Sequence, residues 1–174
     1  VLGATLMNGA ACSAEGVTFD GTNDYVDIEP WEWGGAVTIE VYVKYDAFKS
    51  WTRVLDFGNG AATNNVYLSN TMMGSTISFN VIRQGSQEVL VREGEWDLST
   101  WTHVVATVSG TTMKVYKNGV LAGSAGATAV RGPVYITHQR LRAHAAHCAQ
   151  VLHAQGLRQR RRQRRHHQGH PAEH

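Results

Sequence analysis

The sequence contains few of the residues that cross-link or interrupt a fold. Among its 174 residues are two cysteines and three prolines, and no run approaches the ~18 consecutive apolar residues of a membrane-spanning helix. Cys12 and Cys148 are too few to define a disulfide framework or a zinc ribbon. Val1 is not followed by a basic and apolar secretory signal, although a processed chain would have lost one. The sequence therefore excludes a disulfide scaffold and predicts no membrane span.

Aromatic residues and acidic charge are both scarce beyond Thr137. All five Trp, all six Tyr and all 15 Thr lie at or before this residue. Residues 1–137 carry eight Lys or Arg and 13 Asp or Glu, a net charge of −5, whereas residues 138–174 carry eight Arg and one Glu, a net charge of +7. The total of +2 thus joins two different compositions, and most of the β-forming residues belong to the first.

An apolar residue at every second position predicts β-strands in the first part of the chain. In 37–45 (VTIEVYVKY), four alternate aliphatic residues share one face. Turn residues separate similar runs at the spacing of roughly 8 to 12 residues that is typical of an all-β sandwich or barrel. The predicted strands are 17–20, 25–29, 37–45, 53–57, 66–69, 76–83, 88–92, 101–109 and 113–116. Asn118-Gly119 predicts a two-residue type I′ hairpin turn, because both residues accept a positive φ.

Five short motifs, in this order and spacing, resemble the laminin-G-like, concanavalin-A-like jelly-roll domains: 16–26 (GVTFDGTNDYV), 38–43 (TIEVYV), 54–58 (VLDFG), 101–108 (WTHVVATV) and 113–120 (MKVYKNGV). The resemblance implies an all-β, two-sheet antiparallel β-sandwich over residues 1–131. It also implies a module that is usually extracellular, binds carbohydrate or protein, and often carries calcium. Because lectins, adhesion modules, pentraxins and glycoside hydrolases share the fold, the resemblance implies no single ligand.

The resemblance ends near Arg131, before the closing strand of such domains. The absence of this closing strand would leave strand 17–20 with an unpaired edge. Residues 132–174 are instead predicted to form a basic tail that is helical or disordered, since Leu141, Ala145, Cys148 and Leu152 have the spacing of a short amphipathic helix. A frameshift or a mispredicted exon in the coding DNA is an alternative hypothesis, and translating the genomic region in every frame tests it.

The tail contains an arginine-rich segment, 158–165 (RQRRRQRR). It indicates either a disordered basic tail or salt-sensitive, non-specific binding of nucleic acid or another polyanion. The segment has no aromatic residue on which a base could stack. Nucleic acid is therefore not the expected partner, and any binding of it would use residues 158–165 alone.

Two acidic segments offer different chemistries. The segment 25–29 (YVDIE) resembles the E-x-D-x-E strand of retaining β-glucanases of this architecture, but Tyr25 replaces the first carboxylate, so no catalysis is expected. Asp20, Asn23 and Asp24, in a loop with Gly21, suit calcium, which binds side-chain and carbonyl oxygens. The same residues suit an ordinary β-turn.

Tryptophans near the predicted loops are the candidate ligand contacts. Exposed Trp rings stack against sugars, while neighbouring polar side chains bind hydroxyl groups. The candidate binding residues are Trp31, Trp33, Trp51, Arg53, Asn64 and Asn65; Trp96 also lies beside a loop, Trp101 is predicted to be core, and His103 is predicted to be a hydrogen-bonded strand histidine. We therefore expect a non-catalytic extracellular or cell-surface module for a glycan or a protein partner, a fragment of a larger protein. The alternatives are polyanion binding through the tail and a glycoside hydrolase.

Overall fold

The structure is a computed structural model that describes residues 4–28, 32–34, 36–58, 64–83, 86–126, 133–135, 138–141 and 146–151. Every regular element within these ranges is a β-strand. The described residues include no helix long and apolar enough to cross a membrane.

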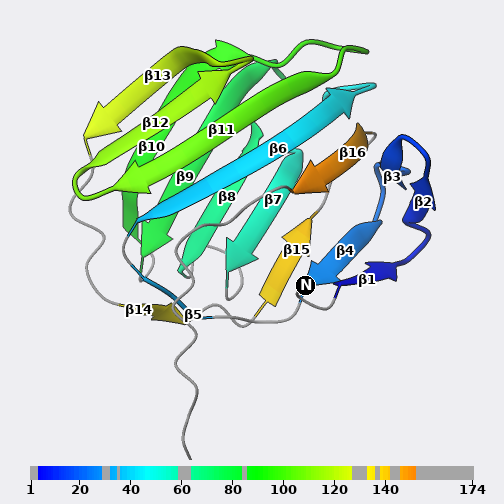
Figure 1. Cartoon of the computed structure of the whole chain (residues 1–174), viewed down its shortest axis with the longest axis horizontal. Helices are drawn as coiled ribbons and strands as arrows, with labels where there is room; N and C mark the ends of the chain where they lie inside the picture. Colours follow the sequence, from blue (N-terminus) through cyan, green and yellow to red (C-terminus); the bar gives the residue numbers. More distant parts are fainter. Residues whose placement is uncertain are drawn as a thin grey trace, which may run out of the picture.

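Two seven-stranded sheets pack face to face as a sandwich (Figure 1). Sheet A contains, in order, β1 (Ala4–Met7), β4 (Tyr25–Ile28), β15 (His138–Leu141), β7 (Arg53–Gly58), β8 (Asn65–Asn70), β9 (Thr76–Arg83) and β10 (Ser86–Glu95). Sheet B contains β13 (Val120–Gly126), β12 (Thr112–Lys117), β11 (Thr102–Ser109), β6 (Val37–Tyr45), β16 (Ala146–Val151), β3 (Gly16–Phe19) and β2 (Ala11–Ser13). β5 (Glu32–Gly34) and β14 (Pro133–Tyr135) form a separate pair. The predicted all-β antiparallel sandwich is thus confirmed.

The period-two pattern places the core between the sheets. Along β6, every second residue from Val37 to Tyr45 is buried, while the residues between them face outward. Sheet A contributes the other half of the core, including Leu55, Leu68 and Phe79, each with none of its surface exposed. The alternation that predicted the strands therefore also separates the core from the outer faces.

The predicted Asn118-Gly119 turn is confirmed. Both residues have positive φ, 49° for Asn118 and 82° for Gly119. Lys117 pairs with Val120, which leaves a two-residue loop between β12 and β13. Such a turn has the twist of the strands that it joins.

The chain after Arg131 supplies strands to the sandwich, which corrects the prediction for the tail. β15 lies between β4 and β7, and β16 lies between β6 and β3. The predicted helix is therefore wrong over 138–141 and 146–151. The predicted unpaired edge of strand 17–20 is also wrong, because β3 pairs with both β2 and β16.

Tertiary pairing explains this error. A strand between two others can hydrogen-bond along both of its edges, and this long-range pairing outweighs a weak helical spacing in the sequence. The edge of β3 that the sequence analysis left open is therefore paired by β16, whose composition does not suggest a strand. The arginine-rich segment 158–165 lies outside the described residues.

Candidate functional site

The outer face of sheet A carries a band of polar side chains. Leu68 of β8, Phe79 of β9 and Val91 of β10 belong to the core, so the residues alternating with them point away from it. Strand register aligns Arg53, Ser69, Ser78 and Arg92 in one row across four strands. Asp56, Tyr67 and Asn80 form the next row. We call Arg53, Asp56, Asn65, Tyr67, Ser69, Ser78, Asn80 and Arg92 the polar face.

The polar face has a buried floor and an accessible rim. Its floor residues are at most 7 % exposed although they lie outside the core: Asn65, Tyr67, Ser69, Ser78 and Asn80. The rim consists of Arg92, which is exposed, and of Arg53 and Asp56, whose side chains keep 30 % and 26 % of their surface exposed. A ligand would therefore contact the rim first.

Polar contacts fix Arg53 and Asp56 in position. The Nη1 of Arg53 donates to Oδ2 of Asp56 at 2.7 Å, and the Nδ2 of Asn65 donates to Oδ1 of the same carboxylate at 3.2 Å. The guanidinium of Arg53 also lies over the ring of Tyr67, 3.8 Å from its centroid. A Cβ at Gly58 would collide with the Asn65 amide, so glycine there leaves room for this network. The rim is thus preorganised rather than free to rotate.

Trp51 lies at the end of the polar face, two residues before β7. It is half-buried, has a φ of 54°, and its N–H donates to the carbonyl of Met72 at 2.9 Å. The guanidinium of Arg92, which starts on β10, lies 5.3 Å from the centroid of the Trp51 ring. The side chains of Arg92 and Trp51 therefore meet, and together they bridge the space between β10 and the start of β7.

The pKa of Tyr67 depends on the burial and on the charges of the polar face. Burial raises the pKa of its phenol above the ordinary value of 10.0, and the nearby Asp56 carboxylate adds to this rise. The positive charges of Arg53 and Arg92 lower the pKa but do not cancel the effect of burial. Both guanidiniums thus act on the same phenol, and Tyr67 stays neutral at physiological pH.

Three atoms of the polar face are buried and have no hydrogen-bond partner among the described residues. They are Nε of Arg53, Oδ1 of Asn65 and Oγ of Ser69. Buried polar atoms without partners are uncommon in folded proteins. Their clustering gives the face an unused capacity to donate and accept hydrogen bonds.

The structure brings together three of the six predicted binding residues. Arg53 and Asn65 share contacts with Asp56, and Trp51 lies at the end of their face. Asn64 is half-buried and directly precedes β8. Trp33 belongs to β5, but its side chain lies outside the described part, as does all of Trp31.

Sequence analysis missed six residues of the polar face: Asp56, Tyr67, Ser69, Ser78, Asn80 and Arg92. The alternation of polar and apolar residues in 65–70 (NVYLSN) was the available signal, since it places Tyr67 and Ser69 with Asn65. No pattern in the sequence placed Arg92 beside these residues, because its place in the row depends on the pairing of β10 with β9.

Two other tryptophans were misplaced by the sequence analysis. Trp96 is 2 % exposed and donates from Nε1 to the carbonyl of Ser69, so it is core rather than a ligand contact. Trp101 is half-buried and stacks on Tyr42, with ring centroids 4.9 Å apart, rather than belonging to the core. Position in a loop did not predict the exposure of these large rings.

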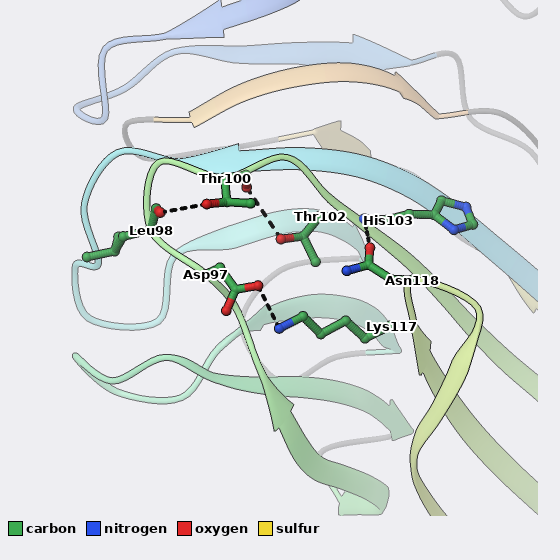
Figure 2. Close-up of polar contacts among 7 residues, drawn as sticks. All are labelled: Asp97, Leu98, Thr100, Thr102, His103, Lys117 and Asn118. Carbon is green, nitrogen blue, oxygen red and sulfur yellow. Dashed lines mark hydrogen bonds and ion pairs between the residues drawn. The ribbon is translucent and has the colours of Figure 1, made fainter.

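The predicted hydrogen-bonded state of His103 is confirmed. Its Nε2 lies 2.8 Å from Oε1 of Glu40, and its backbone N–H donates to Oδ1 of Asn118. Figure 2 shows this backbone contact beside the Lys117–Asp97 ion pair, which ties β12 to the segment before β11. These contacts hold the hairpin in place and do not form a catalytic arrangement.

The predicted calcium residues lie in the loop that connects β3 of sheet B to β4 of sheet A. Asp24 is 6 % exposed; its Oδ2 accepts from the N–H of Asp20 at 2.9 Å, while its Oδ1 is buried without a partner among the described residues. Oδ1 of Asp20 accepts from the N–H of Thr22, as in a turn. The ammonium of Lys49 donates to the carbonyl of Gly21, and the amide of Asn8 donates to the carbonyl of Asn23.

These contacts are those of an ordinary β-turn. They supply only part of what a calcium site needs. The turn uses one oxygen of each Asp, whereas the orphaned oxygen of Asp24 is a free anionic ligand. Lys49 brings a positive charge to the same loop. Across the described ranges, no group of three or more His, Cys, Asp or Glu side chains is placed to hold a metal ion.

Comparison with known proteins identifies the family. The model of the concanavalin A-like lectin/glucanases superfamily matches residues 20–141, beyond the predicted boundary at Arg131. The chain belongs to this superfamily. No curated protein sequence matches it.

Similar solved structures include carbohydrate-binding domains. The carbohydrate-binding module CBM66 from Bacillus subtilis aligns with 18% identity and a TM-score of 0.58, over 86% of this chain and 93% of that one. Domain 4 of the Geobacillus stearothermophilus arabinanase AbnA, in complex with arabinotriose, gives 14% identity and 0.56, over 84% and 74%. The binding domain of botulinum neurotoxin DC, in complex with SialylT, gives 10% and 0.66, over 85% of this chain but only 42% of that one. At these identities the likeness establishes the fold.

Proposed function

We propose that this chain is a non-catalytic carbohydrate-recognition module of a larger extracellular or cell-surface protein. The polar face of sheet A is the proposed sugar-binding surface. The observation that carries this proposal is the cluster of hydrogen-bonding side chains on a sheet face, bounded by Trp51 and containing three polar atoms that have no partner within the described part of the chain. Sugars offer hydroxyl groups that donate and accept, and apolar ring faces that stack on aromatic side chains. The similar carbohydrate-binding module and arabinotriose complex support this choice.

A glycan array probed with the full chain tests the proposal, followed by titration of the best ligand. We expect Trp51→Ala to weaken binding by about tenfold, a loss of ~1.4 kcal/mol, because a stacking surface is removed. Trp101→Ala is the matched control, since Trp101 is also half-buried but lies on sheet B against Tyr42. Binding to a protein partner without any glycan binding would instead favour an adhesion module.

A structural calcium ion in the Asp20–Asp24 loop is a second proposal, supported by the orphaned Oδ1 of Asp24. Asp20, Asn23 and Asp24 would supply oxygen ligands, and the ion would neutralise the buried carboxylate. We expect calcium to raise the melting temperature of the full chain and to lose this effect in Asp24→Asn. An equal response to calcium in Asp24→Asn and the unchanged chain would rule out this site.

The alternatives are separated by the regions that they require. Hydrolysis by a retaining mechanism needs two carboxyl groups about 5 Å apart. In this chain Tyr25 occupies the place of one expected acid. Asp27 is exposed on β4, and Glu29 lies outside the described residues. Hydrolysis of a β-glucan that disappears in Glu29→Gln would contradict the non-catalytic proposal. Polyanion binding through 158–165 would be lost on replacing these arginines, whereas binding at the polar face would remain.

A further inference from the structure

Two arginines converge on the polar face from opposite sides. Arg53 on β7 and Arg92 on β10 end the row that passes through Ser69 and Ser78. With strands about 4.8 Å apart, their Cα atoms are roughly 14 Å from each other. The Arg92 guanidinium contacts the ring of Trp51, which lies two residues before β7, so these two side chains together bridge the space between β10 and the start of β7. Both guanidiniums also influence the ionisation of Tyr67, which lies in the adjacent row.

The convergence leaves an excess of positive charge. Asp56 is the one carboxylate among the eight residues of the polar face, and it pairs with Arg53. Arg92 has no ion-pair partner among the described residues, and its contact there is with an aromatic ring. The face therefore differs in sign from the acidic first part of the sequence.

We propose that the polar face selects a sugar carrying an anionic group, a carboxylate or a sulfate ester, which binds between Arg53 and Arg92. This inference rests on the proposed carbohydrate-binding function and names its ligand class. A guanidinium is planar, permanently charged and able to donate two parallel hydrogen bonds to one anion. Arg53 is held by Asp56 and Tyr67, so little side-chain freedom is lost on binding. Arg92, exposed and without a carboxylate, supplies the uncompensated charge.

The groups around the two arginines explain why a sugar fits better than a simple anion. Ser69 and Ser78 lie between Arg53 and Arg92 in the same row, and both are fully buried, so the accessible groups near the two arginines are those of the rim and of Trp51. A free inorganic anion would use the arginines alone. A sugar acid would also offer hydroxyl groups to the carboxylate of Asp56 on the rim and a ring face to Trp51.

Titration of the full chain with matched acidic and neutral oligosaccharides tests the inference. The probes are oligogalacturonate and its methyl ester, sialyllactose and lactose, and sulfated lactose and lactose. We expect one acidic probe to bind about tenfold or more tighter than its neutral partner, in line with hydrogen bonds to a charged group. The carboxylated and sulfated pairs distinguish the two sources of charge.

Two variants distinguish binding at the polar face from binding by the arginine-rich segment 158–165, which is present in every sample. Arg92→Gln should abolish the preference for the acidic probe, whereas Lys114→Gln, which removes one charge from β12 of sheet B, should leave it unchanged. Equal losses in both variants would show general attraction by charge and overturn the inference. Equal affinity for acidic and neutral probes would overturn it but leave the proposed function intact. Failure to bind any glycan would overturn both.

Discussion

Asn70 shows how one buried amide organises an end of the sandwich. This residue has none of its surface exposed, and its Nδ2 lies within 3.0 Å of three carbonyl oxygens, those of Lys49, Met72 and Gly74. Its backbone N–H donates to the carbonyl of Thr52. Asn70 therefore joins the segment that carries Trp51 to the turn after β8, although propensity alone would assign it to a turn.

Asn70→Asp should destabilise the protein by about 3 kcal/mol. The substitution conserves shape but directs an acceptor, and a buried charge, at carbonyl oxygens. Asn8→Asp is the matched control: Asn8 is exposed and makes one bond to the carbonyl of Asn23, so a loss below about 1 kcal/mol is expected. Urea denaturation measures both values, and similar losses would contradict the role assigned to Asn70.

Tyr67 should make stability fall at alkaline pH. Because its pKa is raised in the folded state, the stabilising effect is fully present below the unfolded pKa near 10 and is lost as pH rises through the folded value. Urea midpoints between about pH 8 and about pH 11 should fall more steeply for the unchanged chain than for Tyr67→Phe. Parallel decreases would show that Tyr67 does not ionise differently on folding.

At the scale of the element, sequence predicts best where local chemistry determines the structure. The strand 37–45 and the Asn118-Gly119 turn were predictable, because burial alternates along the former and positive φ defines the latter. β15 and β16 were not, since their polar residues become strands by pairing with segments about 100 residues away in the chain. For the same reason, Arg53 and Asn65 could each be predicted as binding residues from the sequence. The place of Arg92 on the same face became known only from the pairing of β10 with β9.

The β12–β13 hairpin allows a direct test of turn conformation. Gly119→Ala should cost about 1 to 2 kcal/mol, because a side chain at a φ of 82° is strained even though no atom lies within 4 Å of the added Cβ. Gly126→Ala, where the added Cβ also meets no atom and φ is outside the left-handed region, should change stability by less than about 0.5 kcal/mol. Thermal or urea unfolding checks the difference, and equal effects would exclude strain as its cause.

At the scale of the molecule, two short strands late in the chain join the halves of both sheets. β15 connects β1 and β4 to the rest of sheet A, and β16 connects β2 and β3 to the rest of sheet B. The change in composition at Thr137 therefore does not mark the end of the fold.

Two truncations should have opposite outcomes. Deletion of 138–174 removes both connecting strands and should abolish cooperative unfolding, whereas deletion of 152–174 keeps them and should preserve a single transition. Circular dichroism during heating distinguishes the two. A cooperative transition in the shorter chain would show that β15 and β16 do not complete the sheets.

The insertion of β15 and β16 also bears on the order of folding. Strands β1 to β4 emerge first during synthesis, yet in each sheet the neighbour that links them to the remaining strands is among the last to appear. Closing such long chain loops is entropically costly and slows folding. The first 28 residues would thus remain undocked on the nascent chain until residue 151 has left the ribosome.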